Sequence, residues 1–121
     1  MQFEDLKAWQ KARVLTNGIY RVCKTAPLKN DFGLRDQLQR AAVSAMTNLA
    51  EGFDRVGEGE KLHFWNIARA SAGEVKSLLY VVRDNHLADD VSIQQLQSLA
   101  IEVSALTQGL MNSFSKRRDE Y

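Results

Sequence analysis

The sequence predicts an all-α protein that folds as an up-down-up-down antiparallel four-helix bundle. Apolar residues recur every three or four positions along four long stretches, which is the period of an α-helix. Turn-forming residues fall between those stretches. The 121 residues, 45% apolar and 26% charged, suit one globular domain. We predict a single domain over residues 1–121, with helices near 4–25, 31–54, 59–86 and 91–116. Long helices joined by short loops most simply form a bundle.

The first two helices are separated by the only proline of the chain. Pro27 has no backbone N–H and disfavours helical geometry in the residue before it, so it ends the helix over 4–25. Asn30 or Asp31 can then cap the helix over 31–54. The apolar stripes predicted to face the core are Leu6, Trp9, Ala12, Leu15, Ile19 and Cys23 in the first helix, and Leu34, Leu38, Ala41, Ala45 and Leu49 in the second.

The last two helices follow a glycine-rich break and an aspartate-rich loop. The stretch Gly57-Glu58-Gly59 breaks the chain at the start of the helix over 59–86, and Glu58 and Glu60 suit the positive start of that helix. Asp89 or Asp90 can cap the helix over 91–116, with a capping box from Ser92 to Gln95 as the alternative. The predicted core stripes are Leu62, Trp65, Ala68, Ala72, Val75, Leu79 and Val82, then Ile93, Leu96, Ala100, Val103, Leu110 and Phe114.

Charge and cysteine content exclude several classes of protein. Lys and Arg number 16 against 15 Asp and Glu, a balance that disfavours a strongly basic nucleic-acid binder. The single cysteine cannot form an internal disulfide, which favours a reducing compartment. The N-terminus lacks the pattern of a signal peptide, and no apolar run approaches the ~20 residues of a membrane span. We expect a cytoplasmic protein without a membrane partner.

Two features predict that the chain assembles with copies of itself. The run Leu78–Val82 is apolar on every side of a helix, whereas a surface helix needs a polar side. Between Val91 and Ser115 the only charged residue is Glu102, and depletion of charge marks the centre of protein interfaces. The alternative is a solvated face that happens to carry no charge.

Sites for catalysis are incomplete in this sequence. A di-iron site in a bundle needs two Glu-x-x-His pairs. Glu60 and His63 form one pair, but Arg83 stands where His86 would need its glutamate. Cys23 lies on a core stripe, and Gly57–Lys61 lacks the spacing of a phosphate-binding loop. We expect no enzymatic activity, no metal, no cofactor and no small-molecule substrate.

Basic residues gather near the start of the chain. Residues 1–40 carry eight Lys and Arg against four Asp and Glu. Lys7 and Lys11 share a helix face, and such a stripe can contact phosphates. The alternative is a solvated helix face, although an oligomer would repeat the stripe and raise avidity. The candidate nucleic-acid-binding residues are Lys7, Lys11, Arg13, Arg21, Arg35 and Arg40.

A polar stripe runs beside small residues in the second helix. Its members recur at helical spacing next to Ala41, Ala42 and Ala45, which allow close helix packing. We predict a hydrogen-bonded seam in which Asn48 or Glu51 meets Ser71 or Glu74, because buried polar groups need partners. The alternative is a solvent face. The residues of this predicted polar seam are Gln37, Arg40, Ser44, Asn48, Glu51, Ser71 and Glu74.

The same region carries a resemblance to a known family. The chain resembles the four-helix-bundle proteins encoded in intervening sequences of bacterial 23S ribosomal RNA genes. The matching stretches cover about two-thirds of the chain in order. They are Phe3-x-x-Leu6-x-x-Trp9-x-x-Ala12, Phe32-Gly33-Leu34-x-x-Gln37-Leu38-x-Arg40-Ala41-Ala42-Val43-Ser44, Asn48-Leu49-Ala50-Glu51-Gly52 and Ile67-Ala68-Arg69-x-Ser71-x-x-Glu74. The chain departs from the family pattern at Ala70, where glycine is usual, and at Ala26, where an aromatic residue precedes the proline.

The resemblance implies a bundle that assembles into a homopentamer and has no known catalytic activity. The chain is also similar to accessory proteins of diversity-generating retroelements, which bind a reverse transcriptase and nucleic acid. We therefore expect a homo-oligomeric assembly module that binds RNA or DNA weakly through its basic first helix. The alternative is an adaptor that binds another protein through the charge-poor fourth helix and has no nucleic-acid role.

Overall fold

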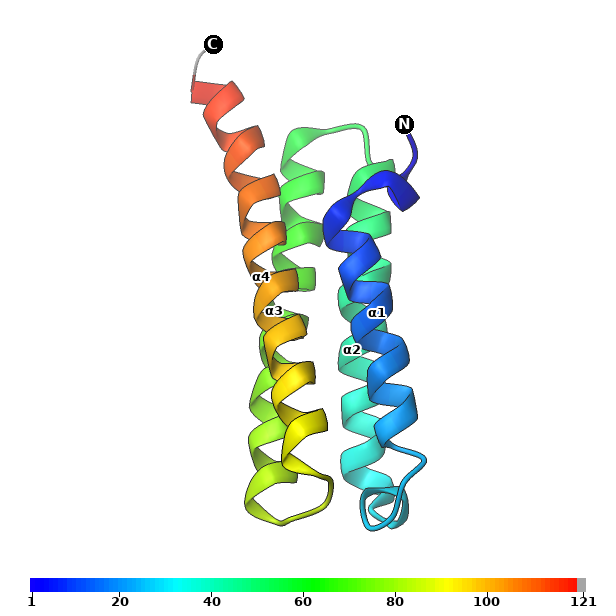
Figure 1. Cartoon of the computed structure of the whole chain (residues 1–121). Helices are drawn as coiled ribbons and strands as arrows, with labels where there is room; N and C mark the ends of the chain where they lie inside the picture. Colours follow the sequence, from blue (N-terminus) through cyan, green and yellow to red (C-terminus); the bar gives the residue numbers. More distant parts are fainter. Residues whose placement is uncertain (120–121) are drawn as a thin grey trace.

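The computed structural model describes the backbone of residues 1–119 and the side chains of residues 1–114. Its four long helices are α1 (Lys7–Val22), α2 (Phe32–Asp54), α3 (Glu58–Asp84) and α4 (Asp90–Asp119). Two short 3₁₀ helices, η1 (Phe3–Asp5) and η2 (Leu28–Asn30), precede α1 and α2. Each long helix runs antiparallel to the next (Figure 1), and α1 packs against both α2 and α4. The predicted four-helix bundle is confirmed.

Helix α1 is shorter at both ends than the predicted span of 4–25. Leu6 has an extended backbone, with φ −69° and ψ 124°, and separates α1 from η1. At the other end, Lys24 N–H donates to the Arg21 carbonyl and Thr25 N–H to the Val22 carbonyl. These bonds to the third preceding residue tighten the last turn and end the regular helix. The helix therefore stops before Pro27 is reached.

Aspartates begin α2 and α4. Asp31 Oδ1 accepts a hydrogen bond from Leu34 N–H at 3.1 Å, and Asp89 Oδ2 accepts one from Ser92 N–H at 2.9 Å. Each bond satisfies a backbone donor that a helix start leaves unpaired. Asp89 is thus the cap of α4, and the alternative box starting at Ser92 is not formed. Helix α4 continues to Asp119, beyond the predicted end at 116, and residues 120–121 lie outside the described part.

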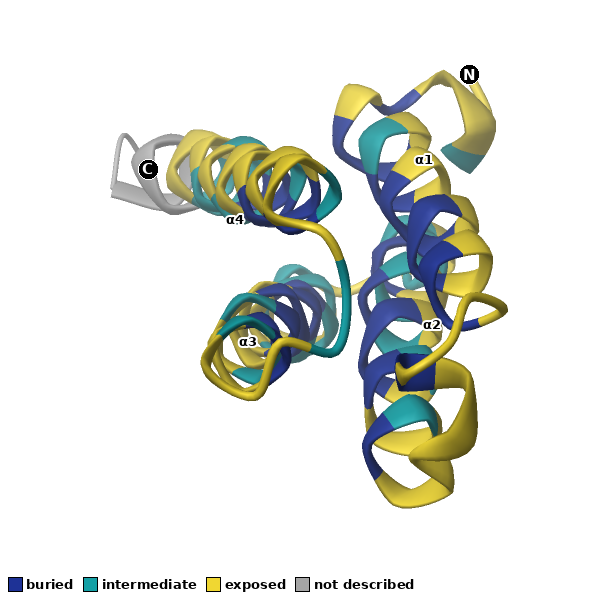
Figure 2. Ribbon diagram, turned by 60° about the horizontal axis from the view of Figure 1, so that its bottom comes forward, coloured by how far each residue is buried: buried dark blue, intermediate teal, exposed yellow. Residues whose placement is uncertain are grey.

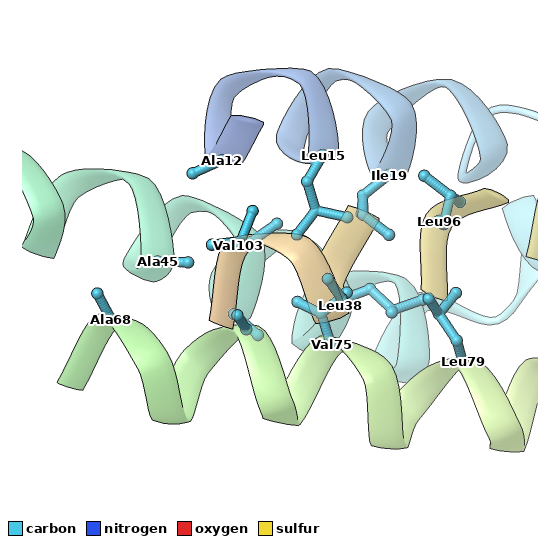
Figure 3. Packing of buried hydrophobic residues seen from close by; sticks show 14 of the residues in the cluster. Ala12, Leu15, Ile19, Leu38, Ala45, Ala68, Val75, Leu79, Leu96 and Val103 are labelled. Carbon is cyan, nitrogen blue, oxygen red and sulfur yellow. The ribbon is translucent and has the colours of Figure 1, made fainter. Parts of the chain in front are cut away.

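The core lies along the shared axis of the four helices. Figure 3 shows Leu15 and Ile19 of α1, Leu38 of α2 and Val75 and Leu79 of α3 converging there. Leu15, Ile19, Leu38, Val75 and Leu79 are fully buried, as are Ile93 and Val103 of α4. Figure 2 shows the complementary pattern, with exposed residues on the outer sides of the helices. Leu62, Leu110 and Phe114, which were predicted as core residues, are only half-buried.

The α2–α3 hairpin is held by contacts to the backbone near the end of α2. The indole N–H of Trp65 donates to the Leu49 carbonyl at 3.2 Å. Lys61 Nζ donates to the Phe53 carbonyl at 2.6 Å and lies 5.6 Å from the centre of the Phe53 ring. The last carbonyls of a helix have no partner within it, so Lys61 satisfies groups that would otherwise be unpaired. Together these bonds fix the register between α2 and α3.

Candidate functional site

Three of the predicted basic residues lie on the side of α1 that faces α4. Lys7, Lys11 and Arg21 fall within one helical face because they are spaced near multiples of 3.6 residues. Lys11 Nζ lies 3.6 Å from Glu102 Oε1 of α4. Arg21 lines a groove of about 470 Å³ with Gln95 and Leu96 of α4. This row therefore follows the α1–α4 boundary.

The other three predicted basic residues lie on the α1–α2 side or beside it. Arg13 is six positions after Lys7, which turns it roughly 120° around α1, and its guanidinium lies 5.8 Å from the centre of the Trp9 ring. Arg35 donates from Nη1 to the Lys29 carbonyl at 3.0 Å. Arg40 pairs with Asp36 at 3.0 Å and is exposed. The structure thus divides the six residues between two sides of the molecule.

A groove on the α1–α2 side contains residues that the sequence analysis did not single out. Its volume is about 400 Å³, and it is lined by Tyr20, Cys23, Lys24, Lys29, Arg35 and Gln39. Only Arg35 of this set was predicted to bind nucleic acid. The available signal was the i, i+4 spacing of Tyr20 and Lys24 in the predicted helix over 4–25, although Lys24 lies in the turn after α1. The sequence did not show that Lys29 of η2 lines this groove, because its position depends on how the loop between α1 and α2 folds.

Cys23 lies buried at the floor of this groove, with 1% of its surface exposed. Burial raises the pKa of its thiol to about 11, and the nearby Arg35 guanidinium opposes the shift only in part. The thiol form is therefore dominant at neutral pH, and the thiolate is the reactive form of cysteine. Cys23 packs as a small apolar side chain, as its position on the core stripe predicts.

The structure brings three members of the predicted polar seam together. The Oγ atoms of Ser44 in α2 and Ser71 in α3 are 2.8 Å apart and share a hydrogen bond. Asn48 Nδ2 donates to the Ser44 carbonyl at 2.9 Å and to Ser44 Oγ at 3.1 Å. The bond between α2 and α3 therefore runs through Ser44, where we had predicted Asn48 or Glu51.

The remaining members of the predicted seam face solvent. Gln37, Arg40, Glu51 and Glu74 are all exposed. Glu51 forms an ion pair with Arg55, and Arg40 forms one with Asp36; in both pairs the partners are four residues apart. The predicted contact of Glu51 with Ser71 or Glu74 is wrong, because Glu51 pairs with Arg55, which lies four residues further along the chain and directly follows α2. A three-residue cluster replaces the seven-residue seam.

The outer faces of α3 and α4 carry exposed apolar residues, and α4 also carries little charge. Tyr80 and Val81 of α3 are 48% and 44% exposed, and Val91 and Ile101 of α4 are 64% and 50% exposed. Two glycines lie in the same helices, and a Cβ built on Gly73 or Gly109 meets no atom within 4 Å. These positions therefore have free space outside them in a single copy of the described chain.

The histidine of the incomplete Glu60–His63 pair lies at the surface. His63 is exposed on α3 and contacts the edge of the Phe64 ring, with 5.3 Å between ring centres. Among the residues that the structure describes, no three His, Cys, Asp or Glu side chains lie together in an arrangement that could bind a metal ion. None of the helices in that part of the chain is both long and apolar enough to cross a membrane.

The chain matches the model of a known protein family. A family model described as 23S rRNA-intervening sequence protein matches residues 4–109. Among curated proteins, none matches the chain. The matched range begins in η1 and ends within α4, so it includes α1, α2 and α3 whole and the first two-thirds of α4.

Proposed function

The chain belongs to the 23S rRNA-intervening sequence protein family, and we propose that it is a non-enzymatic module that assembles with copies of itself and binds RNA or DNA weakly. A homopentamer is the expected assembly. Its cytoplasmic location is part of the same proposal. The observation that carries the assembly is the outer surface formed by the exposed apolar residues of α3 and the charge-poor side of α4.

That outer surface has the composition of an interface. Glu102 is the only charged residue between Val91 and Phe114 of α4. Val91, Ile101, Tyr80 and Val81 add apolar area that a single chain leaves in water. Interface centres are depleted in charge and enriched in aromatic residues, and covering these side chains recovers the hydrophobic free energy of burial. A second copy of the chain offers a surface of the same kind.

The glycines of α3 and α4 give independent support. Glycine inside a helix costs about 1 kcal/mol relative to alanine. Nothing within one chain requires that cost at Gly73 or Gly109, because a Cβ at either position would meet open space. Bare backbone allows another helix to approach closely. Close contact with a neighbouring copy would explain why glycine stands at Gly73 and Gly109.

Native mass spectrometry at micromolar concentration tests the assembly. We expect a mass five times the 13.7 kDa of one chain. The variants Tyr80→Glu and Ile101→Glu should reduce the mass toward that of one chain, since each places a charge on the proposed interface. Val14→Glu is the matched control, because Val14 is 48% exposed but lies on α1. A monomeric wild type would contradict the proposal.

Weak binding of nucleic acid is proposed from the exposed cations around α1. Lys7, Arg13 and Arg21 are exposed and form no salt bridge with any carboxylate among the described side chains. Each phosphate contact releases counterions, so affinity for structured RNA should fall steeply as salt rises. The absence of measurable binding at ~50 mM salt would remove this part of the proposal.

An adaptor for another protein is the alternative, favoured by the charge-poor face of α4. The two functions are separated by reversing the charge of Lys7 and Lys11. If the chain binds nucleic acid through α1, the Lys7→Glu/Lys11→Glu variant loses RNA binding. An adaptor that uses α4 would keep its protein partner in the same variant.

A further inference from the structure

The groove between the end of α1 and the start of α2 combines positive charge with an exposed aromatic ring. Lys24, Lys29 and Arg35 line it together with Tyr20, Gln39 and the buried Cys23. No carboxylate is among these residues. Its volume of about 400 Å³ falls within the ~300–1,000 Å³ of small-molecule sites, so it has room for a nucleotide unit.

The acids nearest in sequence are already engaged. Asp31 Oδ1 accepts a hydrogen bond from Leu34 N–H at the start of α2. Asp36 pairs with Arg40 at 3.0 Å. Lys24, Lys29 and Arg35 form no salt bridge with any of the described carboxylates. Their charge is therefore available to an anion from outside the chain.

Arg35 is held in position before any ligand arrives. Its Nη1 donates to the Lys29 carbonyl at 3.0 Å, and its guanidinium lies 5.0 Å from the centre of the Phe32 ring. A guanidinium has five N–H donors in a fixed plane, so donors remain for the oxygens of a phosphate. A side chain that is already ordered loses less entropy when it binds.

Tyr20 and Gln39 supply the contacts that a base needs. The Tyr20 side chain is 40% exposed, so part of it is accessible from solvent. Tyr20 and Gln39 also line a second hollow of about 400 Å³ along α2, together with Val43, Thr47 and the ion pair of Asp36 with Arg40. The two adjoining hollows give successive nucleotides of one strand a continuous path.

We infer that this groove binds single-stranded nucleic acid, with phosphates on Lys24, Lys29 and Arg35 and a base against Tyr20. The inference rests on the nucleic-acid binding of the proposed function. It places the main binding site on the α1–α2 side and not along the Lys7–Lys11 row. A single strand fits because its bases can turn outward and stack on an aromatic ring, whereas paired bases in a duplex cannot.

Fluorescence anisotropy with a fluorescein-labelled oligouridylate of about 12 nucleotides tests the inference, a length within the ~4–16 nucleotides of known single-strand sites. We expect the Lys24→Gln/Lys29→Gln variant to bind at least roughly tenfold more weakly at ~50 mM salt. The slope of log K against log salt should also become shallower by about 1.4, since each single-strand phosphate contact contributes ~0.7.

The matched control is Lys7→Gln/Lys11→Gln, which removes the same charge from the α1–α4 side. If only this control loses affinity, the groove is overturned while the proposed nucleic-acid binding stands. If the wild type binds no RNA, both are overturned. Circular dichroism and native mass verify that each variant is folded and assembled.

Tyrosine variants test the stacking contact. Tyr20→Leu should weaken binding roughly fivefold or more, which is the smallest effect expected when one stacked base is lost. Tyr20→Phe keeps the aromatic ring and should retain the affinity. Equal binding of a duplex, together with an unaffected Tyr20→Leu variant, would overturn the single-strand assignment. Equal affinity for uridine monophosphate would likewise overturn binding of a strand.

Discussion

Gly52 of α2 lies directly against Trp65 of α3, and a Cβ placed on Gly52 would come within 2.5 Å of the indole nitrogen. Trp65 is 1% exposed and donates its indole N–H to the Leu49 carbonyl. Because Gly52 has no Cβ, it leaves room for the indole of Trp65, the largest fully buried side chain. This contact gives a physical role to the glycine that ends the Asn48–Gly52 stretch.

Replacing Gly52 by alanine should destabilise the bundle. Because Trp65 occupies the space of the new methyl group, we expect a loss of about 1–3 kcal/mol in the free energy of unfolding. Chemical denaturation measures this loss. Gly33→Ala is the control, because a Cβ there meets nothing within 4 Å and alanine favours a helix. Equal stability of the two variants would show that Trp65 moves aside without cost.

The Ser44–Ser71 hydrogen bond should couple α2 to α3 energetically. Ser71→Ala leaves the partly buried Ser44 hydroxyl without its interhelical partner, at a cost of about 1 kcal/mol in unfolding free energy. A double-mutant cycle with Ser44→Ala should give a coupling energy of about 0.5–1.5 kcal/mol. Glu74→Ala serves as the control, since Glu74 is exposed. Additive effects of the two serine substitutions would contradict the coupling.

The buried Cys23 thiol should make stability fall at alkaline pH. Its pKa is raised from 9.0 to about 11, so the unfolded chain releases this proton at lower pH than the folded chain. The contribution of the Cys23 thiol to the free energy of unfolding is fully present below pH 9 and is lost as the pH rises toward 11. Unfolding followed from pH 8 to 11 should show a steeper loss in the wild type than in Cys23→Ala. Parallel profiles would contradict the raised pKa.

Alanine at Gly73 or Gly109 should separate folding from assembly. Each substitution adds up to about 1 kcal/mol of helix stability to a single chain, since the new methyl group meets no neighbour there. If copies approach each other at these glycines, the same methyl groups weaken the oligomer. Native mass on dilution should show earlier dissociation without a lower thermal stability of the dissociated chain. Tighter assembly would place the interface elsewhere.

Removing the carboxylate opposite Lys11 tests whether the Lys7–Lys11 row contributes to RNA binding. Glu102 lies 3.6 Å from Lys11 Nζ and neutralises it, while the half-exposed pair adds only about 0–1 kcal/mol to stability. If RNA binds along the Lys7–Lys11 row, Glu102→Gln should raise the affinity several-fold; if RNA binds in the α1–α2 groove, as inferred above, Glu102→Gln should raise it no more than a remote charge change does. In both cases the unfolding free energy should change little. Glu74→Gln makes the same change of net charge on α3. An equal gain in both variants would mean that only net charge matters.

The sequence by itself determined the number and order of the helices and which side of each faces the core. The period of apolar residues placed Trp9, Cys23 and Trp65 inside. Asp31 and Asp89 were each one of the cap candidates, because a helix start needs a local acceptor, and the structure chose between them and their neighbours. These features depend on residues close together in the chain.

Only the tertiary structure decided which polar residues meet and which cations share a surface. Periodicity gives the direction of a side chain around its own helix, but not its height relative to the neighbouring helix. Ser44, not Glu51, meets Ser71, because the Trp65 and Lys61 contacts near the end of α2 set that register. In the same way, η2 places Lys29 beside Arg35 and Tyr20. This arrangement depends on the conformation of the loop, which helical spacing does not predict.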